Sequence, residues 1–553
     1  MDYTNTNTDT NLDTYANMPY AAQAAPVYPA YPVYVKPENI FKPEKRDFVF
    51  ALVVFVLGYL FSRWILFAGY GWGVAAFTTL YLLSVATYLM KKGALAKSGA
   101  TWFWLGITWI TGLSYAFWEN AGFSSIRTLF LFCSAVYFVI SASSSQIMGK
   151  TGNYLLIDGF NAVVILPFRN FVNQYVSFGA LKKGEKKSGK ALPVVIGLIL
   201  ALFLIVWLTP LLKSADSGGF SIILDFLARV FTIRYEVVIK IIVHCTCAIP
   251  IAAYIYGLVS GAAFKKGTDI IKAEPAKKMV AGLRFLQQTT VFIALGAVCL
   301  LYIIFIMSQL PYFFSAFTGR RPEGWLIYAE YARQGFFELC SIAAINLFII
   351  TIGNITCKKK QADSSLLKTF NIGLALITLV LIATAFSKMA LYISAYGLTM
   401  PRLLPCVFMV FMAIIFVALI VRQKWEFSIV RFGLVTGSVM LCSLCLFNPD
   451  ALVVRYNTDR YLSGTLREYD LDILYRAGYA GVLPAIEVYE KTTDEQQKAM
   501  IELYLKYQDS LYTNYFHNPA SSIGSGINEY SVEMYRARQA IEAQKHPFLT
   551  GTE

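Results

Sequence analysis

The sequence has little of what soluble enzymes and nucleic-acid-binding proteins use. Only three histidines occur in 553 residues, and charged residues make up 15% of the chain, against roughly a quarter in soluble domains. Histidine-based zinc sites and catalytic triads therefore have few residues to work with. The phosphate-binding GxxxxGK[ST], zinc-binding HExxH and nucleophile-bearing GxSxG patterns are all missing. We expect no cofactor and no metal, and we assign no catalytic residue.

Cysteine is missing from one whole end of the chain. All nine cysteines precede Asn448 and lie in or beside hydrophobic runs, where cysteine packs as a small hydrophobic residue. Cys245 and Cys247 lie next to His244, but no second ligand pair at zinc-like spacing accompanies them. Core packing is therefore the favoured interpretation of this group, and disulfides are not expected to stabilise the C-terminal segment.

Long hydrophobic runs dominate the chain instead. Hydrophobic residues make up 57% of it, and the mean hydropathy is +0.53. Runs of about 20 apolar residues match a hydrocarbon layer about 30 Å thick, so the sequence predicts an all-α, polytopic helical membrane protein. The eleven predicted spans are 48–69, 72–90, 100–118, 126–143, 191–212, 237–259, 286–309, 334–355, 369–394, 402–421 and 430–447. Two amphipathic stretches, 154–179 and 219–236, are expected to lie at the membrane interface.

The two ends of the chain differ from this central part. We expect residues 1–45 to be a disordered cytoplasmic tail rich in Tyr and Pro, 46–447 a transmembrane domain, and 448–553 a small helical domain. The net charge of +14 would indicate nucleic acid in a soluble protein. Here, however, Lys and Arg cluster between alternate spans, and the segment from Asn448 onward holds 10 Lys/Arg against 15 Asp/Glu. This distribution predicts a cytoplasmic N-terminus, an extracytoplasmic C-terminus and no nucleic-acid partner.

Several ionisable or amide side chains fall inside or at the ends of the predicted spans. An ionisable group at the centre of a membrane helix costs roughly 2.5–3.5 kcal/mol on insertion scales, so it usually faces the interior of the bundle. With a rise of about 1.5 Å per residue, five such groups are expected at similar depth toward the outer face, above one asparagine near the midplane. These candidates for a binding cavity are Arg63, Glu119, Lys240, Glu338, Lys388 and Asn346. Snorkelling of the cations or purely structural pairing is the favoured alternative.

Two longer stretches carry a family resemblance. They are YARQGFFELCSIAAIN at 331–346 and NPDALVVRYNTDRYLSG at 448–464, and ILPFRNF at 165–171 accompanies them. Together they resemble a bacterial polytopic membrane family that is catalogued only as a domain of unknown function, from about Phe48 to Glu490. The resemblance implies a multi-pass architecture and a bacterial plasma-membrane location. It implies no activity, ligand or catalytic residue.

The second of these stretches also predicts a junction between the membrane spans and the C-terminal domain. Pro449 cannot continue a helix from the residue before it, and Asp450 suits the first turn of a new helix, where the dipole favours an acid. We expect this helix to dock the C-terminal domain on the outer mouth of the bundle. The predicted junction residues are Arg333, Asp450, Arg455, Asn457, Asp459 and Arg460, with Arg455 and Asp459 paired at i,i+4 spacing.

Three functions stay open. The favoured one is a membrane scaffold or sensor whose outer domain meets a protein or envelope partner, because catalytic motifs are missing and the C-terminal domain is acidic. The second is a transporter or lipid-handling permease that uses the charged candidates as an outward-facing cavity, with membrane lipids as partners. The third and least favoured is an enzyme acting at the outer leaflet, since no nucleophile–base pair is evident.

Overall fold

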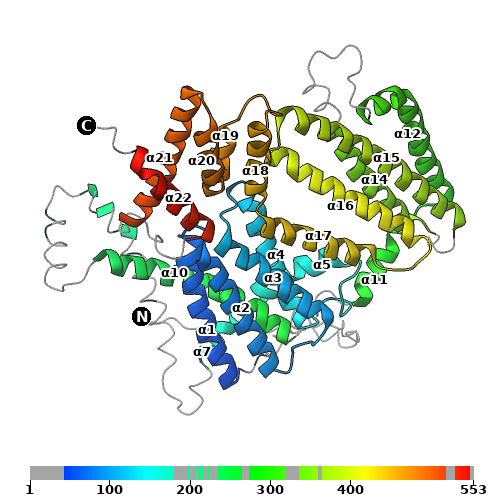
Figure 1. The fold of residues 1–553 in the computed structure, drawn as a ribbon. Coiled ribbons are helices and arrows are strands. Elements are labelled where there is room, and N and C mark those ends of the chain that lie inside the picture. Colours follow the sequence, from blue (N-terminus) through cyan, green and yellow to red (C-terminus); the bar gives the residue numbers. More distant parts are fainter. Residues whose placement is uncertain are drawn as a thin grey trace, which may run out of the picture. The chain divides into compact units, whose positions relative to one another are not determined.

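The computed structural model describes residues 43–179, 235–264, 273–317, 336–358, 364–517 and 530–548, together with scattered single positions. Within these residues the regular elements are helices, joined by turns and short connections, and one isolated bridge links Leu286 and Cys357 (Figure 1). Four predicted features lie wholly or largely outside the described residues. They are the N-terminal tail 1–45, the span 191–212, the interfacial stretch 219–236 and the junction residue Arg333.

Nine helices in the described ranges are long and apolar enough to cross a bilayer, which confirms the predicted all-α polytopic membrane bundle. The predicted span at 100–118 forms helix α3 (Gly99–Phe117), which is not one of the nine. Its Thr, Ser and Gly residues lower its hydropathy, and Thr108, Thr111 and Ser114 are buried against neighbouring helices. The count of eleven spans therefore stays a prediction. The nine are Lys45–Leu66, Trp72–Lys91, Ala121–Ala142, Val238–Ala263, Gln288–Ser308, Phe336–Thr356, Ser365–Tyr396, Met400–Arg422 and Ile429–Phe447.

A first group of helices packs around α10 (Tyr235–Ala263). Helix α1 packs along α10, and Gly58 permits the close approach, because an added Cβ there would lie 2.7 Å from the carbonyl oxygen of Ala248. Helices α2, α3 and α4 follow as successive neighbours, and the 3₁₀ turn η2 joins α3 to α4. The bounds of these elements are α1 (Lys45–Phe61), its π-helical continuation η1 (Ser62–Leu66), α2 (Trp72–Lys91), η2 (Ala121–Phe123) and α4 (Ser124–Ala142).

The stretch expected at the membrane interface, 154–179, forms four short helical pieces that pack within this first group. Its middle approaches α10 closely, since an added Cβ at Gly257 would lie 2.3 Å from the carbonyl oxygen of Pro167. Its polar side chains meet protein groups, as when buried Gln174 donates to the carbonyl oxygen of Ala51 at 3.2 Å. The pieces are α5 (Leu155–Phe160), the π-helix η3 (Asn161–Ile165), α6 (Leu166–Arg169) and α7 (Asn173–Phe178).

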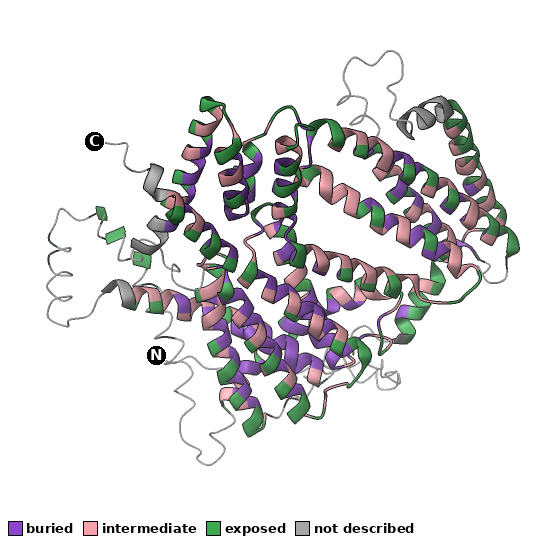
Figure 2. Cartoon of the chain, viewed as in Figure 1, coloured by how far each residue is buried: buried purple, intermediate pink, exposed green. Residues whose placement is uncertain are grey.

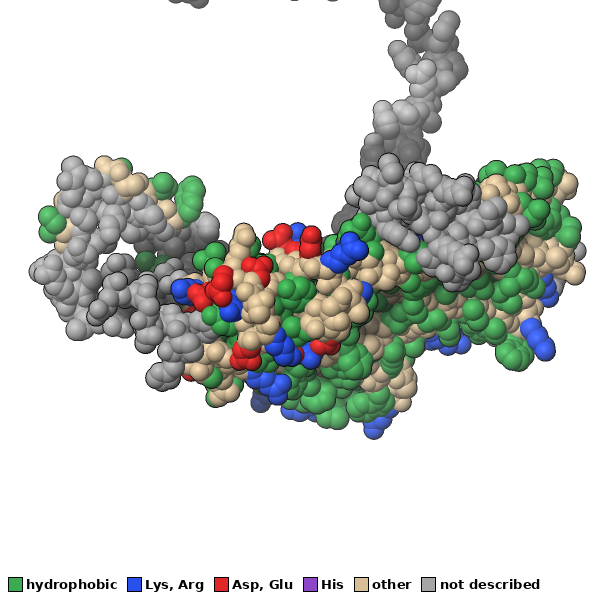
Figure 3. All heavy atoms as spheres, turned by 45° about the horizontal axis from the view of Figure 1, so that its top comes forward, with side chains coloured by type: hydrophobic (Ala, Val, Ile, Leu, Met, Phe, Trp, Pro, Cys, Tyr) green, Lys and Arg blue, Asp and Glu red, His purple; other side chains and the backbone are tan. Residues whose placement is uncertain are grey.

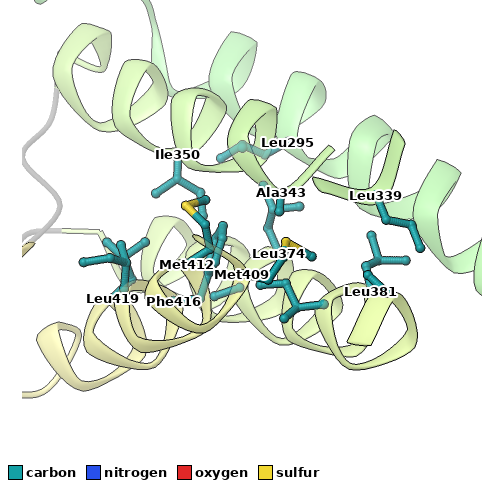
Figure 4. Close-up of a cluster of buried hydrophobic side chains, with 14 of the residues drawn as sticks. Leu295, Leu339, Ala343, Ile350, Leu374, Leu381, Met409, Met412, Phe416 and Leu419 are labelled. Carbon is teal, nitrogen blue, oxygen red and sulfur yellow. The ribbon is translucent and has the colours of Figure 1, made fainter. Parts of the chain in front are cut away.

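A second group of helices has its own apolar core. Figure 4 shows Leu339 and Ala343 pointing toward Leu374 and Leu381 of the neighbouring helix. Helix α17 contacts both α3 and α16 and so links the two groups. The elements are α12 (Gln288–Phe317), α14 (Phe336–Thr356), α15 (Ser365–Tyr396), α16 (Met400–Arg422) and α17 (Ile429–Phe447), and the short helix α11 (Ala273–Gly282) precedes them in the chain.

The C-terminal helices share a separate buried cluster that includes Val454, Leu474, Val488 and Tyr504, and Figure 2 shows buried residues on the sides of these helices that face one another. Their bounds are α18 (Pro449–Leu462), α19 (Asp472–Ala477), η6 (Gly478–Gly481), α20 (Val482–Lys491), α21 (Glu495–His517) and α22 (Val532–Phe548). At the start of α21, the side chain of Asp494 accepts hydrogen bonds from the amides of Gln496 and Gln497 at 3.0 and 3.4 Å, so an aspartate caps this helix.

Candidate functional site: a carboxylate junction

The last membrane helix ends and the first C-terminal helix begins at Asn448. This residue adopts the left-handed conformation with φ 47°, and its side-chain oxygen accepts a hydrogen bond from the amide of Ala451 at 3.2 Å. Pro449 follows at the first helical position, where a missing N–H does no harm. The sharp change of direction places Asp450 in the buried first turn of α18.

Three carboxylates from distant parts of the sequence meet at this turn. Asp450 on α18 accepts a hydrogen bond from the amide of Gly122 at 3.0 Å. Glu119, just after α3, accepts one from the amide of Tyr479 at 3.2 Å. Glu533 on α22 accepts one from the amide of Glu119 at 2.9 Å. The three bonds tie the C-terminal helices to the connection between α3 and α4.

Two glycines make room for these carboxylates. An added Cβ at Gly122 would lie 2.6 Å from an oxygen of Asp450, and one at Gly478 would lie 2.5 Å from an oxygen of Glu119. Gly478 also has φ +60°, a conformation that side chains rarely adopt. Both positions therefore require glycine for the close approach of a carboxylate to the main chain.

Arg127 is the buried cation beside this group, with no exposed area. Its guanidinium donates to the carbonyl oxygens of Trp118, at 3.0 Å, and Glu119, and it lies 3.7 Å from the centre of the Tyr115 ring. Its Nε has no hydrogen-bond partner among the described residues. A buried charge needs opposite charge and hydrogen bonds nearby, and the neighbouring carboxylates supply the negative charge.

Burial raises the pKa of all three carboxyl groups, and loss of hydration is the largest cause in each case. The pKa of Asp450 is raised to about 6 and that of Glu533 to about 7. The negative charge of Glu119 raises both values further, whereas the hydrogen bonds from Gly122 and Glu119 act in the opposite direction. This group can therefore take up and release protons near neutral pH.

The other predicted junction residues lie around the edge of α18. Arg455 and Asp459 form an ion pair at 2.9 Å, and Arg455 also reaches Glu487 of α20 at 2.6 Å. Buried Asn457 binds the amide and the carbonyl oxygen of Leu398, each at 2.7 Å. Arg460 donates to the carbonyl oxygen of Ile393 at 3.1 Å. The Asn457 and Arg460 contacts hold α18 against the end of α15 and the connection that follows it, whereas Arg455 joins α18 to α20.

The predicted cavity residues fall in different helix groups. Arg63 in η1 is exposed and Lys240 on α10 is half-buried, both in the first group. Glu338 on α14 is exposed and interacts electrostatically with half-buried Lys388 on α15, in the second group. Glu119 belongs to the junction described above. A shared cavity formed by these residues therefore stays a prediction.

Asn346 is buried near the middle of α14 and fully engaged there. The Tyr302 hydroxyl donates to its side-chain oxygen at 2.8 Å, and its amide nitrogen donates to the Thr378 hydroxyl at 2.9 Å. These bonds cross from α14 to α12 and α15. They fit the predicted role of an amide that joins helices.

Two residues of the junction were not singled out in the sequence. Arg127 begins a predicted span, where a cation is usually read as snorkelling to the headgroups. Glu533 is one of several acids on a polar helix, and nothing in its neighbours distinguishes it. The proximity of Arg127 to Glu119 in the sequence was the one usable signal.

The comparisons with known proteins agree with this architecture. The sequence matches the family described as "Domain of unknown function (DUF4153)" over residues 48–488. The chain belongs to this family. No curated protein and no solved structure is significantly similar to it. The DUF4153 match runs from α1 to α20, so it includes Glu119 and Asp450, while Glu533 lies beyond its end.

Proposed function

We propose that this DUF4153 protein is a membrane sensor or scaffold whose C-terminal helices meet a partner outside the cytoplasm. In this proposal, protonation of Glu119, Asp450 and Glu533 sets how tightly those helices dock on the membrane helices. The observation that carries the proposal is the junction itself, because each carboxylate hydrogen-bonds across it. The Lys/Arg distribution between the spans supports an extracytoplasmic position for these groups.

The direction of the pH effect follows from the raised pKa values. Docked Asp450 and Glu533 have pKa values of about 6 and about 7, whereas undocked carboxyls have ordinary values near 4. The docked state therefore binds protons more tightly than the undocked state. The stability that these bound protons give to the docked state is fully present below about pH 4. It is lost as the pH rises through 6 to 7. Alkaline conditions should loosen the junction, and mildly acidic conditions should tighten it.

An exposed apolar stripe on α21 supports a partner-binding role. Met500, Leu503 and Tyr507 lie on one face at i, i+3 and i+7, and their side chains are 49%, 64% and 47% exposed. Helices with this pattern commonly lie in the apolar groove of another protein. Charged residues of the same helix, Glu502, Lys506 and Asp509, lie beside the stripe in the sequence, and Figure 3 shows acidic and basic side chains close together on the face that it draws. An apolar centre with a charged rim is typical of protein interfaces.

The docking half of the proposal is tested by hydrogen–deuterium exchange on the full chain in detergent micelles. We expect faster exchange in peptides from α18, α19 and α22 at pH 8 than at pH 5, after correction for the chemical exchange rate. Glu533→Gln imitates the protonated carboxyl and should reduce the difference. Glu542→Gln, on the same helix but in an exposed pair with Arg538, is the matched control. Equal pH dependence in both variants would contradict the proposal.

The partner half is tested separately, by placing a photocrosslinking amino acid at Leu503 in the full-length protein in its native membrane. We expect a discrete adduct whose yield changes with Glu533→Gln and not with Glu542→Gln. A crosslinker at Leu483, which is exposed on α20 outside the stripe, is the spatial control. An adduct of equal yield from both positions would indicate non-specific contact.

A further inference from the structure

A large apolar cavity lies between helices of the first group. Its volume is about 1000 Å³, at the upper end of small-molecule sites. Side chains from η1, α2, α4, η3, α6 and α10 line it, including Ile65, Phe77, Phe132, Val163 and Ile251. Several of these elements are long and apolar enough to cross a membrane, so we expect lipid around the cavity.

The irregular segments of the first group coincide with this cavity. The π-helix η1 contributes Ile65, and the π-helix η3 contributes Val163 and Val164. Pro250, which interrupts the hydrogen bonding inside α10, also lines the wall. π-Helical turns are rare and frequently occur at functional sites. Two π-helical turns and an internal proline line the same cavity. We infer from this that the fold forms the cavity specifically.

Among the described residues, none of the side chains that line the cavity is charged. Two of its tyrosines are already engaged, since Tyr81 donates to the carbonyl oxygen of Ala135 at 3.2 Å and Tyr254 to that of Val163 at 3.0 Å. A ligand with an ionised head inside the cavity would bury an unpaired charge, which is strongly unfavourable in a membrane.

Hydroxyl groups gather at one end of the cavity. Ser124, Ser125 and Thr128 line it in the first turns of α4, and the Thr128 hydroxyl lies 2.8 Å from that of Tyr115. The Ser124 and Thr128 hydroxyls donate to the carbonyl oxygens of Ala121 and Ser124 at 3.1 and 2.9 Å. What these two hydroxyls offer a ligand is therefore acceptor lone pairs, which suit a head group that donates from its own hydroxyl. This end of α4 adjoins η2, which contacts α18 of the C-terminal helices.

The length of the cavity matches one leaflet. It extends along α4 from Ser124 to Val136, which corresponds to about 18 Å of helix at 1.5 Å per residue. Half of a hydrocarbon layer is about 15 Å thick. A lipid chain could therefore enter from one leaflet with its head at the hydroxyl end.

We propose that this cavity binds an uncharged amphiphile, namely a lipid with a hydroxyl-bearing, non-ionised head such as a diacylglycerol. The head lies against Ser124, Ser125 and Thr128, and the hydrocarbon chain fills the space between η1, η3 and α10. The proposal does not depend on protonation of the carboxylate junction, although the two sites are neighbours, since Tyr115 of the lining lies 3.7 Å from the Arg127 guanidinium. It assigns the protein a lipid-binding site in the leaflet on the side of the C-terminal helices.

The test uses the full chain in nanodiscs of phosphatidylcholine and phosphatidylglycerol, doped with a photoactivatable diacylglycerol or with the matching phosphatidic acid. We expect labelling by diacylglycerol to exceed that by phosphatidic acid, with adducts on peptides from α4 or α10. Ala135→Trp fills the cavity and should reduce diacylglycerol labelling about tenfold. Ala344→Trp makes the same change on an exposed face of α14 and should leave labelling unchanged.

Thermal unfolding of each variant is measured in parallel, and Thr128→Val is a second variant that alters the hydroxyl end without adding volume. It should reduce the preference for diacylglycerol over phosphatidic acid while labelling by chain contact persists. Equal labelling of wild type and folded Ala135→Trp would overturn the site. Stronger labelling by phosphatidic acid would overturn the assignment of an uncharged head.

Discussion

The carboxylate junction (Glu119, Asp450 and Glu533) and the Asn346 layer, which we define as Asn346 with Tyr302 and Thr378, bury polar groups in opposite ways. Asn346 is neutral, and both ends of its amide are paired with the hydroxyls of Tyr302 and Thr378. The junction instead buries Asp450 and Glu533 as ionisable groups, and the buried cation Arg127 lies beside Glu119 and Asp450. Both regions lie at helix contacts. Only the junction can change its charge near neutral pH.

The two regions show that a buried polar group can stabilise a helix contact with or without dependence on pH. An amide with satisfied hydrogen bonds contributes the same stability at every ordinary pH. A carboxylate whose pKa is raised by burial couples the contact to proton concentration. We therefore infer that the Asn346 layer holds neighbouring helices together at any ordinary pH, whereas the stability of the junction changes with pH. The following variants test that contrast.

The largest effect is expected for Arg127→Met. Removing one partner from a buried set of charges typically costs about 3–5 kcal/mol, and here the carboxylates would lose their buried cation. The loss in unfolding free energy, measured by chemical denaturation in micelles, should be greater at pH 8 than at pH 5, since protonated carboxyls need no cation. An equal loss at both pH values would assign Arg127 a packing role alone.

Asn346→Leu should come next. It leaves the hydroxyls of Tyr302 and Thr378 without their amide partner, and an unsatisfied buried group costs about 1–3 kcal/mol. The same denaturation assay should give equal losses at pH 5 and pH 8. Adding Tyr302→Phe should recover part of the stability, because it removes the hydroxyl that lost its acceptor, whereas the Thr378 hydroxyl still donates to the carbonyl oxygen of Leu374 at 2.6 Å. A loss that varied with pH would remove the contrast with the junction.

Glu533→Gln should have a smaller effect that depends on pH. The uncharged side chain avoids the desolvation of a carboxylate, so the variant should gain on the order of 1–2 kcal/mol relative to wild type at pH 8 and little at pH 5. Differential scanning fluorimetry across this range measures the change. A constant offset across the pH range would show that Glu533 does not titrate in the docked state.

Arg455→Met should have the smallest effect. The side chains of Arg455 and Asp459 are 55% and 54% exposed, and exposed ion pairs contribute about 0–1 kcal/mol. The variant is also the matched control for Arg127→Met, because it makes the same chemical change at an exposed position. A loss as large as that of Arg127→Met would indicate that the edge of α18, and not the buried charge, dominates docking.

Much of the architecture could be predicted from local patterns. Apolar runs of membrane length predicted the nine spans found in the described residues, because crossing a hydrocarbon layer imposes a length on each helix by itself. The end of α17 at Asn448 followed from Pro449, and the pairing of Arg455 with Asp459 followed from helical spacing. The Asn346 amide needs a hydrogen-bond partner in any apolar bundle, and the sequence alone predicts that need. It does not predict which helix supplies the partner.

The tertiary structure alone decided which polar groups meet. Glu119, Asp450 and Glu533 come from three separate stretches of the sequence, and their raised pKa values come from the loss of water when α18 and α22 cover the loop after α3. No local pattern encodes that burial. The apolar cavity is a further case, because empty space arises from how η1, η3 and α10 pack, whereas the sequence of each segment reads only as hydrophobic. The sequence of each helix determines which of its side chains must be buried. Packing determines which neighbours cover those side chains, and therefore which carboxyl groups stay protonated near neutral pH.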